Sequence, residues 1–211
     1  MKNIVILLLI AFAVSACYHR DPLADPNVLG LTGDYSFREL TRSEKEDVIK
    51  QIKSAEGVKY VWGGQSFTDG VDCSGLLVWS YAMLGYSGFR KDDTVVYDLT
   101  SNDMSMYDVD HAVPVTDNAQ LLDYEMGDFL FFDVNADGRV DHVAVFMHYD
   151  PEKDAVWVWD ASTNTGRVAY REFYGFLKKN PKIGRPVKPV RNEIPADCTA
   201  CAEISGAGIS Q

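Results

Sequence analysis

Residues 57–84, GVKYVWGGQSFTDGVDCSGLLVWSYAML, decide the fold of this chain and hold its first candidate functional residue. A Gly63-Gly64 break follows a short apolar run. Asp72-Cys73-Ser74-Gly75 then opens a second apolar run, which predicts a buried helix that ends at Gly85. A cysteine at a helix N-terminus meets the positive end of the helix dipole, which favours the thiolate that a cysteine nucleophile needs. A buried structural cysteine would fit the same pattern, so Cys73 alone leaves both interpretations open.

A second set of motifs lies in the C-terminal half of the chain. Residues 129–132 and 142–147 predict two strands around the polar loop DVNADGRVD, and residues 156–160 predict a third strand after a turn at 150–154. Two further elements, at 167–176 and 182–190, complete the domain. A helix carrying a cysteine and packed on an antiparallel sheet carrying a histidine defines an α+β plan.

Taken together, these motifs resemble the signature of the NlpC/P60 family of bacterial cell-wall cysteine peptidases. The resemblance rests on YVWGG at 60–64, DCSGL at 72–76, GDFLFF at 127–132 and DHVAVF at 141–146. It covers roughly residues 42–187, and several separated motifs in the right order are more specific than one short pattern. It implies a papain-like fold, with N-terminal helices packed on a central antiparallel sheet.

Composition narrows the class of partner. The chain has 211 residues, a formal net charge of −11 and 46% hydrophobic residues, which suits one domain with a real core plus short extras. Binding to nucleic acid requires clustered Lys and Arg, so the acidic balance argues against it.

The N-terminus has the pattern of an export signal. One lysine precedes an apolar run at 4–14 that is too short to span a bilayer comfortably, which predicts a signal peptide at 1–16. VSAC at 14–17 resembles a bacterial lipobox, which implies a lipidated Cys17 that anchors the protein in the cell envelope. The next residue is Tyr18 rather than Asp. In enteric-type bacteria, this resembles the pattern of lipoproteins that are sorted to the outer membrane, so we expect the protein on the periplasmic face of that membrane. An ordinary signal peptide with an incidental cysteine is the alternative.

The rest of the chain divides into three parts. Residues 17–40 contain prolines and glycines, show no clear hydrophobic period and predict a tether. Residues 41–190 form the expected catalytic domain, whose first helix begins with a Thr41–Glu44 capping box. Within it, the stretch 85–125 departs from the family pattern, and both a pocket-shaping role and an inert insertion are open. The tail, 191–211, carries Cys198 and Cys201, to which we assign no function.

Four histidines are candidates for the catalytic base: His19, His111, His142 and His148. His19 falls in the tether, and His111 falls in the stretch that departs from the family. His142 and His148 share one strand, and we expect them to face the same way about 20 Å apart, so only one can contact Cys73. His142 matches the family motif and is the expected base.

The imidazole of His142 needs an acceptor that orients it. Pairing the strands about the turn at 150–154 puts residues 160–162 opposite His142, so Asp160, Ser162 and Asn164 can share its face. Asp160 aligns with the third position of the family site, and we expect it to accept a hydrogen bond from Nδ1. Asn164 is the second candidate, and an Asp that simply starts a turn is the structural alternative.

Three further residues match family positions. Tyr60 resembles the tyrosine that contacts the catalytic cysteine and helps the oxyanion site, and Asp72 and Ser74 resemble residues that bind the free amino end of a peptide. A carboxylate beside Cys73 opposes thiolate formation unless it caps the helix or engages a substrate amine.

The resemblance therefore implies a lipid-anchored cysteine endopeptidase. Cys73 is the expected nucleophile, and the expected substrate is the bond from D-glutamate to a diamino acid in peptidoglycan stem peptides. An amidase or acyltransferase on the same Cys-His scaffold is the alternative enzyme. A non-catalytic envelope binding lipoprotein is the alternative of a different class. No cofactor is required by this chemistry.

The loop at 133–141 suggests a structural calcium ion. It repeats the D-x-N-x-D-G spacing of a calcium-binding loop, in which alternate oxygen ligands surround a hard cation. The position of the bidentate Glu is occupied by Ala144, and an ordinary polar turn is the alternative. The expected ligands are Asp133, Asn135, Asp137, the Arg139 carbonyl and Asp141.

If this loop binds calcium, millimolar calcium should raise the melting temperature, because a ligand that binds only the folded state stabilises it. Asp137→Ala should remove that increase. A melting curve that neither calcium nor a chelator moves would leave the loop as an ordinary turn.

Overall fold

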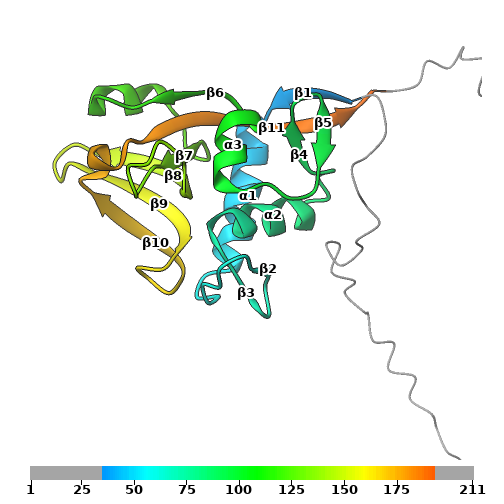
Figure 1. The fold of residues 1–211 in the computed structure, drawn as a ribbon, viewed down its shortest axis with the longest axis horizontal. Helices are drawn as coiled ribbons and strands as arrows, with labels where there is room; N and C mark the ends of the chain where they lie inside the picture. Colours follow the sequence, from blue (N-terminus) through cyan, green and yellow to red (C-terminus); the bar gives the residue numbers. More distant parts are fainter. Residues whose placement is uncertain (1–34, 193–211) are drawn as a thin grey trace, which may run out of the picture.

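A seven-stranded antiparallel sheet is the frame of residues 35–192, the part of the chain that the computed structural model describes (Figure 1). The strand order is β1-β11-β7-β8-β9-β10, and β6 also pairs with β11. The sheet strands are β1 (Tyr35–Glu39), β6 (Val109–Pro114), β7 (Phe129–Phe132), β8 (His142–Asp150), β9 (Ala155–Ser162), β10 (Arg167–Tyr174) and β11 (Lys182–Arg191).

Helices and two small hairpins complete the fold. The α-helices are α1 (Arg42–Ser54), α2 (Cys73–Met83) and α3 (Ser101–Tyr107). The 3-10 helices are η1 (Asn118–Asp123) and η2 (Phe176–Lys179), and the hairpin strands are β2 (Gln65–Ser66), β3 (Gly70–Val71), β4 (Phe89–Lys91) and β5 (Thr94–Val96). The predicted α+β class, with N-terminal helices packed on a central antiparallel sheet, is confirmed.

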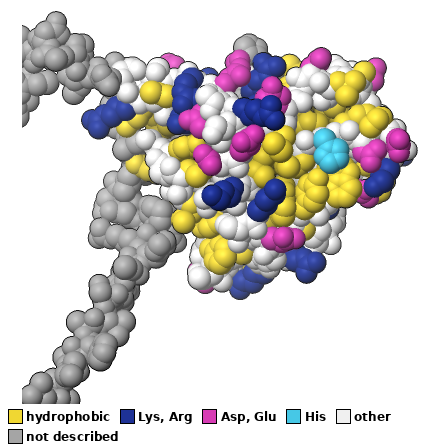
Figure 2. Space-filling view, turned by 180° about the vertical axis from the view of Figure 1, so that it is seen from behind, with side chains coloured by type: hydrophobic (Ala, Val, Ile, Leu, Met, Phe, Trp, Pro, Cys, Tyr) yellow, Lys and Arg dark blue, Asp and Glu magenta, His cyan; other side chains and the backbone are white. Residues whose placement is uncertain are grey.

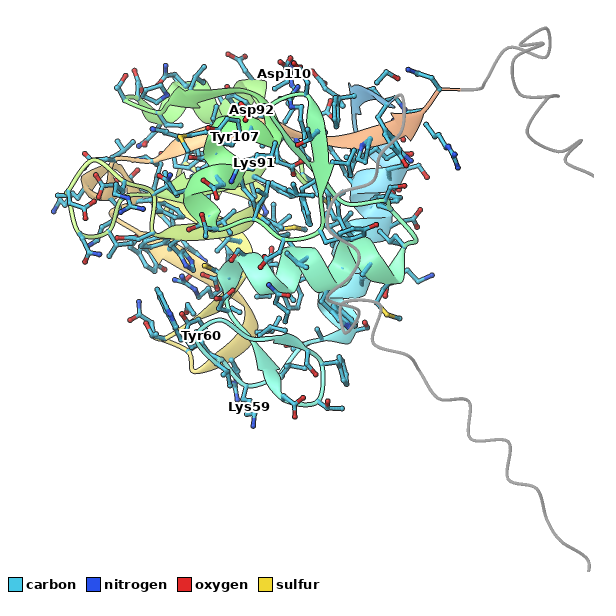
Figure 3. The ribbon with its side chains drawn as sticks, turned by 45° about the vertical axis from the view of Figure 1, so that its right-hand side comes forward. Lys59, Tyr60, Lys91, Asp92, Tyr107 and Asp110 are labelled. Atoms are coloured by element: carbon cyan, nitrogen blue, oxygen red, sulfur yellow. The ribbon has the colours of Figure 1, made fainter. Side chains whose placement is uncertain are left out.

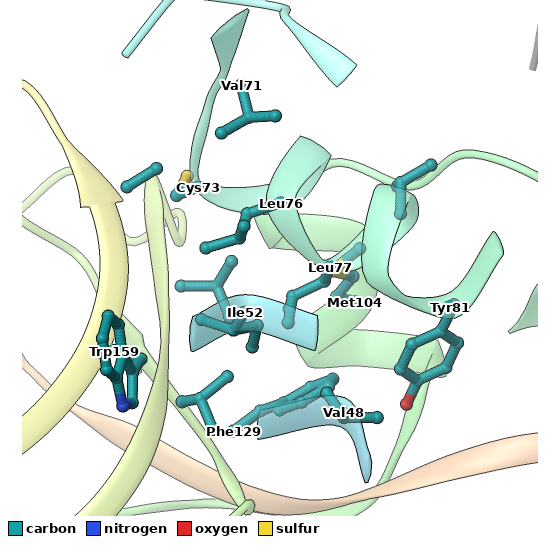
Figure 4. Packing of buried hydrophobic residues seen from close by; sticks show 14 of the residues in the cluster. Val48, Ile52, Val71, Cys73, Leu76, Leu77, Tyr81, Met104, Phe129 and Trp159 are labelled. Carbon is teal, nitrogen blue, oxygen red and sulfur yellow. The ribbon is translucent and has the colours of Figure 1, made fainter. Parts of the chain in front are cut away.

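The helices α1 and α2 cover one face of the sheet. The predicted capping box of α1 is confirmed, since Thr41 and Glu44 each bond the other's backbone N–H. The apolar face of α1 packs against α2 and the sheet (Figure 4), with Ile52 of α1, Leu76 of α2 and Phe129 of β7 in one cluster. The opposite face of the sheet has its own core, which includes Phe132.

A buried ion pair joins α1 to the start of β7. The ammonium of Lys45 lies 2.6 Å from the Asp128 carboxylate, and both side chains are almost completely buried. Gly127 makes room for the pair, because a Cβ at this position would lie 2.5 Å from the Lys45 Cβ. Breaking such a pair would leave an uncompensated buried charge, which is costly. The intact pair therefore fixes α1 in place on the sheet.

Two regions differ from the prediction or add to it. Residues 35–39, assigned to the tether, form β1 and pair with the distant β11, so the tether boundary at residue 40 is wrong. The stretch 85–125 is folded: it supplies the β4–β5 hairpin, α3, β6 and η1. Its residues line a cavity of about 370 Å³ together with Phe37 of β1.

The prediction that His148 faces the same way as His142 is wrong, because a β-bulge lies between them. The register of β8 against β9 shifts between Phe146 and His148, so an extra residue is inserted at this point. Because side chains alternate along a strand, the bulge turns His148 to the face opposite that of His142. His148 lies opposite Trp157 and its ring stacks on the Trp157 ring, with the centroids 5.8 Å apart.

Acidic and basic side chains surround a hydrophobic band on the back of the molecule (Figure 2). None of the helices within residues 35–192 is long and apolar enough to cross a membrane. The predicted signal peptide, Cys17 and the cysteines at 198 and 201 lie outside the described residues.

Candidate active site

The site is built around the first turn of α2. Asp72 is the N-cap residue, and its carboxylate accepts hydrogen bonds from the Gly75 amide at 2.7 Å, the Gly63 amide at 2.8 Å and the Ser74 hydroxyl at 3.1 Å. These bonds satisfy free N–H groups at the helix start and tie the preceding loop to it. A Cβ at Gly75 would lie 1.9 Å from the Gly64 carbonyl oxygen, so this approach requires glycine.

Asp72 and Ser74 are therefore engaged with each other and with the backbone. The Asp72 carboxylate is bound by three donors, so it serves as the helix cap that the sequence analysis names as one of its two possible roles. The contact of Asp72 and Ser74 with a substrate amine stays a prediction.

Cys73 is the first residue of α2 and is 8% exposed (Figure 4). Among the described residues it is a free cysteine. The His142 ring, at the start of β8, is 13% exposed and lies close enough to the Cys73 side chain for the two groups to interact. The structure thus brings the predicted nucleophile and the predicted base together.

Asp160 of β9 is the acceptor that orients His142. Its Oδ2 lies 2.8 Å from the His142 Nε2, and the residue is 1% exposed. The predicted contact through Nδ1 is wrong: Asp160 approaches the ring at Nε2, which leaves Nδ1 as the nitrogen for the thiol. Asn164 is exposed in the turn that follows β9, and Ser162 bonds Thr165 instead of the histidine.

The electrostatic surroundings favour a charged His142 paired with Asp160. Burial lowers the pKa of His142, but hydrogen bonds to Asp160 and Cys73 outweigh it and raise the pKa to about 9. Burial also raises the pKa of Asp160, and here the hydrogen bonds from His142 and Arg171 outweigh it, so that pKa is lowered. An ionised Asp160 is thus available to hold the imidazolium.

Arg171 of β10 is a site residue that the sequence analysis does not include. Its Nε and Nη2 donate to the Asp160 Oδ1 and Oδ2 at 2.9 and 2.5 Å. The signal for it lies in the β9–β10 hairpin, where Ala169 is opposite Asp160 and Arg171 is the next residue on the same face. A buried carboxylate needs partners, so this diagonal cation could have been inferred.

Tyr60 lies on the segment that leads to the β2–β3 hairpin (Figure 3). Its side chain is close enough to Cys73 for the two groups to interact. The Tyr60 amide donates to the Gly166 carbonyl at 2.8 Å, which fixes the segment against the β9–β10 turn. Burial, followed by the charges of Cys73 and Asp72, raises the pKa of Tyr60 to about 12. The hydroxyl therefore stays protonated and can act as a hydrogen-bond donor.

The acidic loop at 133–141 is held by its own backbone. The carboxylates of Asp133 and Asp141 each accept two backbone N–H groups of the loop, at 3.0–3.1 Å. Within the described part of the chain, no group of three or more His, Cys, Asp or Glu side chains is arranged to hold a metal ion. These bonds fit the interpretation as a turn, and calcium binding stays a prediction.

The comparisons with known proteins agree with the sequence motifs. The NlpC/P60 family profile matches residues 57–181, which is more than half of the chain. This protein therefore belongs to the NlpC/P60 family. The matched region contains Cys73, His142, Asp160 and Arg171.

Two curated relatives are similar over part of their length. The bifunctional muramidase/DL-endopeptidase CwlT of Bacillus subtilis is 39% identical over 62 residues, 29% of this chain and 17% of that protein. The murein DD-endopeptidase MepH of Escherichia coli is 31% identical over 107 residues, 51% of this chain and 33% of that protein. This chain spans a third or less of the length of either relative.

Among solved structures, an NLP/P60-family protein from Staphylococcus aureus, described as similar to lipoprotein, has a TM-score of 0.49 and 22% identity. The match covers 76% of this chain and 45% of that one.

The cap on α2 generates a prediction about stability. Asp72→Ala should lower the free energy of unfolding by about 2 kcal/mol, because it removes the acceptor for two backbone amides. Thr41→Ala, at the N-cap of α1, is the matched control and should cost about 1 kcal/mol. Urea unfolding of both variants measures the difference. Equal losses would mean that the bond from Asp72 to the Gly63 loop contributes nothing.

Proposed function

We propose that this protein is a cysteine peptidase that hydrolyses an amide bond in peptidoglycan stem peptides. The observation that carries the proposal is the placement of Cys73, at the start of a buried helix, beside His142, whose ring is hydrogen-bonded to Asp160. Such a series of nucleophile, base and orienting acid is what amide hydrolysis through a covalent intermediate needs. Membership of the NlpC/P60 family and the endopeptidase names of its relatives support the substrate class.

In the first half of the reaction, the Cys73 sulfur attacks the amide carbonyl while its proton resides on His142. The oxyanion that forms accepts hydrogen bonds from the Cys73 amide, which at the first position of a helix has no acceptor within it, and from the Tyr60 hydroxyl. His142 then gives its proton to the leaving amine as the C–N bond breaks, which leaves a thioester on Cys73.

In the second half, water hydrolyses the thioester. His142 takes a proton from the attacking water, the C–S bond breaks, and the carboxylate product leaves. Asp160 accepts a hydrogen bond from the Nε2–H of His142 throughout and so keeps the ring in one orientation. Burial of Asp160 makes this orientation rigid.

The proposed bond joins D-glutamate to a diamino acid such as meso-diaminopimelate. The name of CwlT includes a DL-endopeptidase activity, and the name of MepH includes a DD-endopeptidase activity. Mass analysis of the fragments distinguishes these two bonds, and it also distinguishes an amidase, which would separate glycan from peptide.

The test is digestion of purified peptidoglycan by the wild-type protein and four variants. Cys73→Ala should abolish the release of fragments, and His142→Ala should approach the same loss, since residues that act as a unit are not additive. Asp160→Ala should cost less. His148→Ala, which changes a second histidine of the same strand, should retain activity within about twofold.

Three results would contradict the proposal. Substantial hydrolysis by a clean Cys73→Ala preparation would exclude Cys73 as the nucleophile. A severe loss in His148→Ala with none in His142→Ala would exclude His142 as the base. Folded, inactive protein in all variants and in the wild type would favour a binding lipoprotein.

We also propose that the protein is anchored in the bacterial cell envelope through a lipid on Cys17. The proposal rests on the lipobox-like VSAC at 14–17. In cell fractionation, the wild type should sediment with membranes, and Cys17→Ser should be released, because the acyl chains supply most of the membrane affinity. A Cys17→Ser protein that stays with the membranes would refute the lipid anchor.

A further inference from the structure

We propose that Arg171 is a positioning residue that holds the Asp160 carboxylate in place. Its positive charge also limits how strongly Asp160 stabilises the protonated form of His142. This role rests on the proposed function of His142 as base and acid. It concerns a residue outside the Cys73–His142–Asp160 series. Arg171 acts on the reaction through its contact with Asp160 and through the effect of its charge on His142.

The contacts of Asp160 show how its carboxylate is divided. Arg171 donates to both carboxylate oxygens, at 2.9 and 2.5 Å, and His142 donates to the same Oδ2 that Arg171 Nη2 contacts. The two-point contact of a guanidinium fixes the plane of a carboxylate. Oδ2 is therefore aimed at the histidine by the arginine.

Aromatic rings close this arrangement into a circuit. The Arg171 guanidinium lies 4.9 Å from the centre of the Phe173 ring. Phe173 packs on Phe132 with centroids 4.7 Å apart, and Phe132 stacks on His142 at 6.0 Å. Each member of the circuit is held from two sides, so the arginine and the histidine are placed relative to one another by packing as well as by charge.

The charges around His142 give the direction of the electrostatic effect. Asp160 of β9 and Arg171 of β10 face it from the sheet, and Cys73 faces it from α2, where Tyr60 and Asp72 lie near the thiol. The Arg171 cation repels an imidazolium and neutralises part of the Asp160 charge. Both effects make the proton on His142 easier to release to a leaving amine.

The experiment compares three variants of the full-length protein. Arg171→Met removes the charge and both hydrogen bonds while keeping the aliphatic stem. Arg171→Lys keeps the charge but loses the two-point contact. Arg167→Met is the matched control, because Arg167 is an exposed arginine on the same strand and the same face, four residues away.

The first readout is the titration of the His142 imidazole by NMR with ¹⁵N-labelled histidine, which needs no substrate. Arg171→Met should raise the pH midpoint of His142 by about one unit, because a nearby positive charge is lost. Arg171→Lys should keep the midpoint near that of the wild type. Arg167→Met should leave it unchanged.

The second readout is the hydrolysis of peptidoglycan fragments. Arg171→Met and Arg171→Lys should both lower kcat, by about tenfold for the Met variant, with little change in KM, because supporting partners of a catalytic group affect its orientation. The basic limb of the pH profile should move to higher pH in Arg171→Met only.

An unchanged His142 midpoint in folded Arg171→Met would overturn the proposal and leave Arg171 as a structural ion pair. An equal shift in Arg167→Met would also overturn it, as would a raised KM with an unchanged kcat. If Arg171→Met does not fold, a full wild-type kcat in Arg171→Lys refutes the positioning role. Failure of the wild type to cleave peptidoglycan would refute the proposed function alone, since the NMR titration would still report on Arg171.

Discussion

The site depends on one buried carboxylate, that of Asp160. A carboxylate removed from water is costly unless donors surround it, and Asp160 receives one from β8 and two from β10. These bonds tie three neighbouring strands together at the point where the histidine must be held. The charge that stabilises this part of the sheet is the same charge that orients His142.

The other half of the site depends on a helix cap. Asp72 fixes the start of α2 and, through the Gly63 amide, the loop that carries Tyr60. The sheet positions the base and the cap positions the nucleophile, so the packing of α2 on the sheet determines the distance between them. The apolar cluster shared by α1, α2, β7 and β9 supplies that packing.

Local signals in the sequence were enough for much of the fold. The Thr41–Glu44 pair marks α1, the all-round apolar pattern marks α2 as buried, and the strand periods predict β7, β8 and β9. Alternation along β9 places Asp160, rather than a neighbour, on the face of His142. These features depend on residues close together in the chain, where periodicity and capping rules apply.

The features that sequence reasoning missed depend on long-range contacts or on local irregularity. The strand β1 forms by pairing with β11, far along the chain, with Phe37 opposite Pro189. Its own sequence has no strong apolar alternation, so the sequence alone did not predict it. No glycine marks the bulge before His148, and the partner of Asp160 is visible only once β9 and β10 are in register. Which nitrogen of His142 meets Asp160 depends on ring orientation, which strand pairing does not determine.

The central claim is that Cys73 performs the covalent step, and stoichiometric alkylation tests it most directly. The protein would be treated with increasing iodoacetamide, the labelled fraction of Cys73 measured by peptide mapping, and hydrolysis of peptidoglycan measured in the same samples. The other cysteines would be replaced by serine so that labelling reports on one thiol. Hydrolysis should fall in proportion to the labelled fraction of Cys73, whereas hydrolysis that persists when Cys73 is completely labelled would contradict the mechanism.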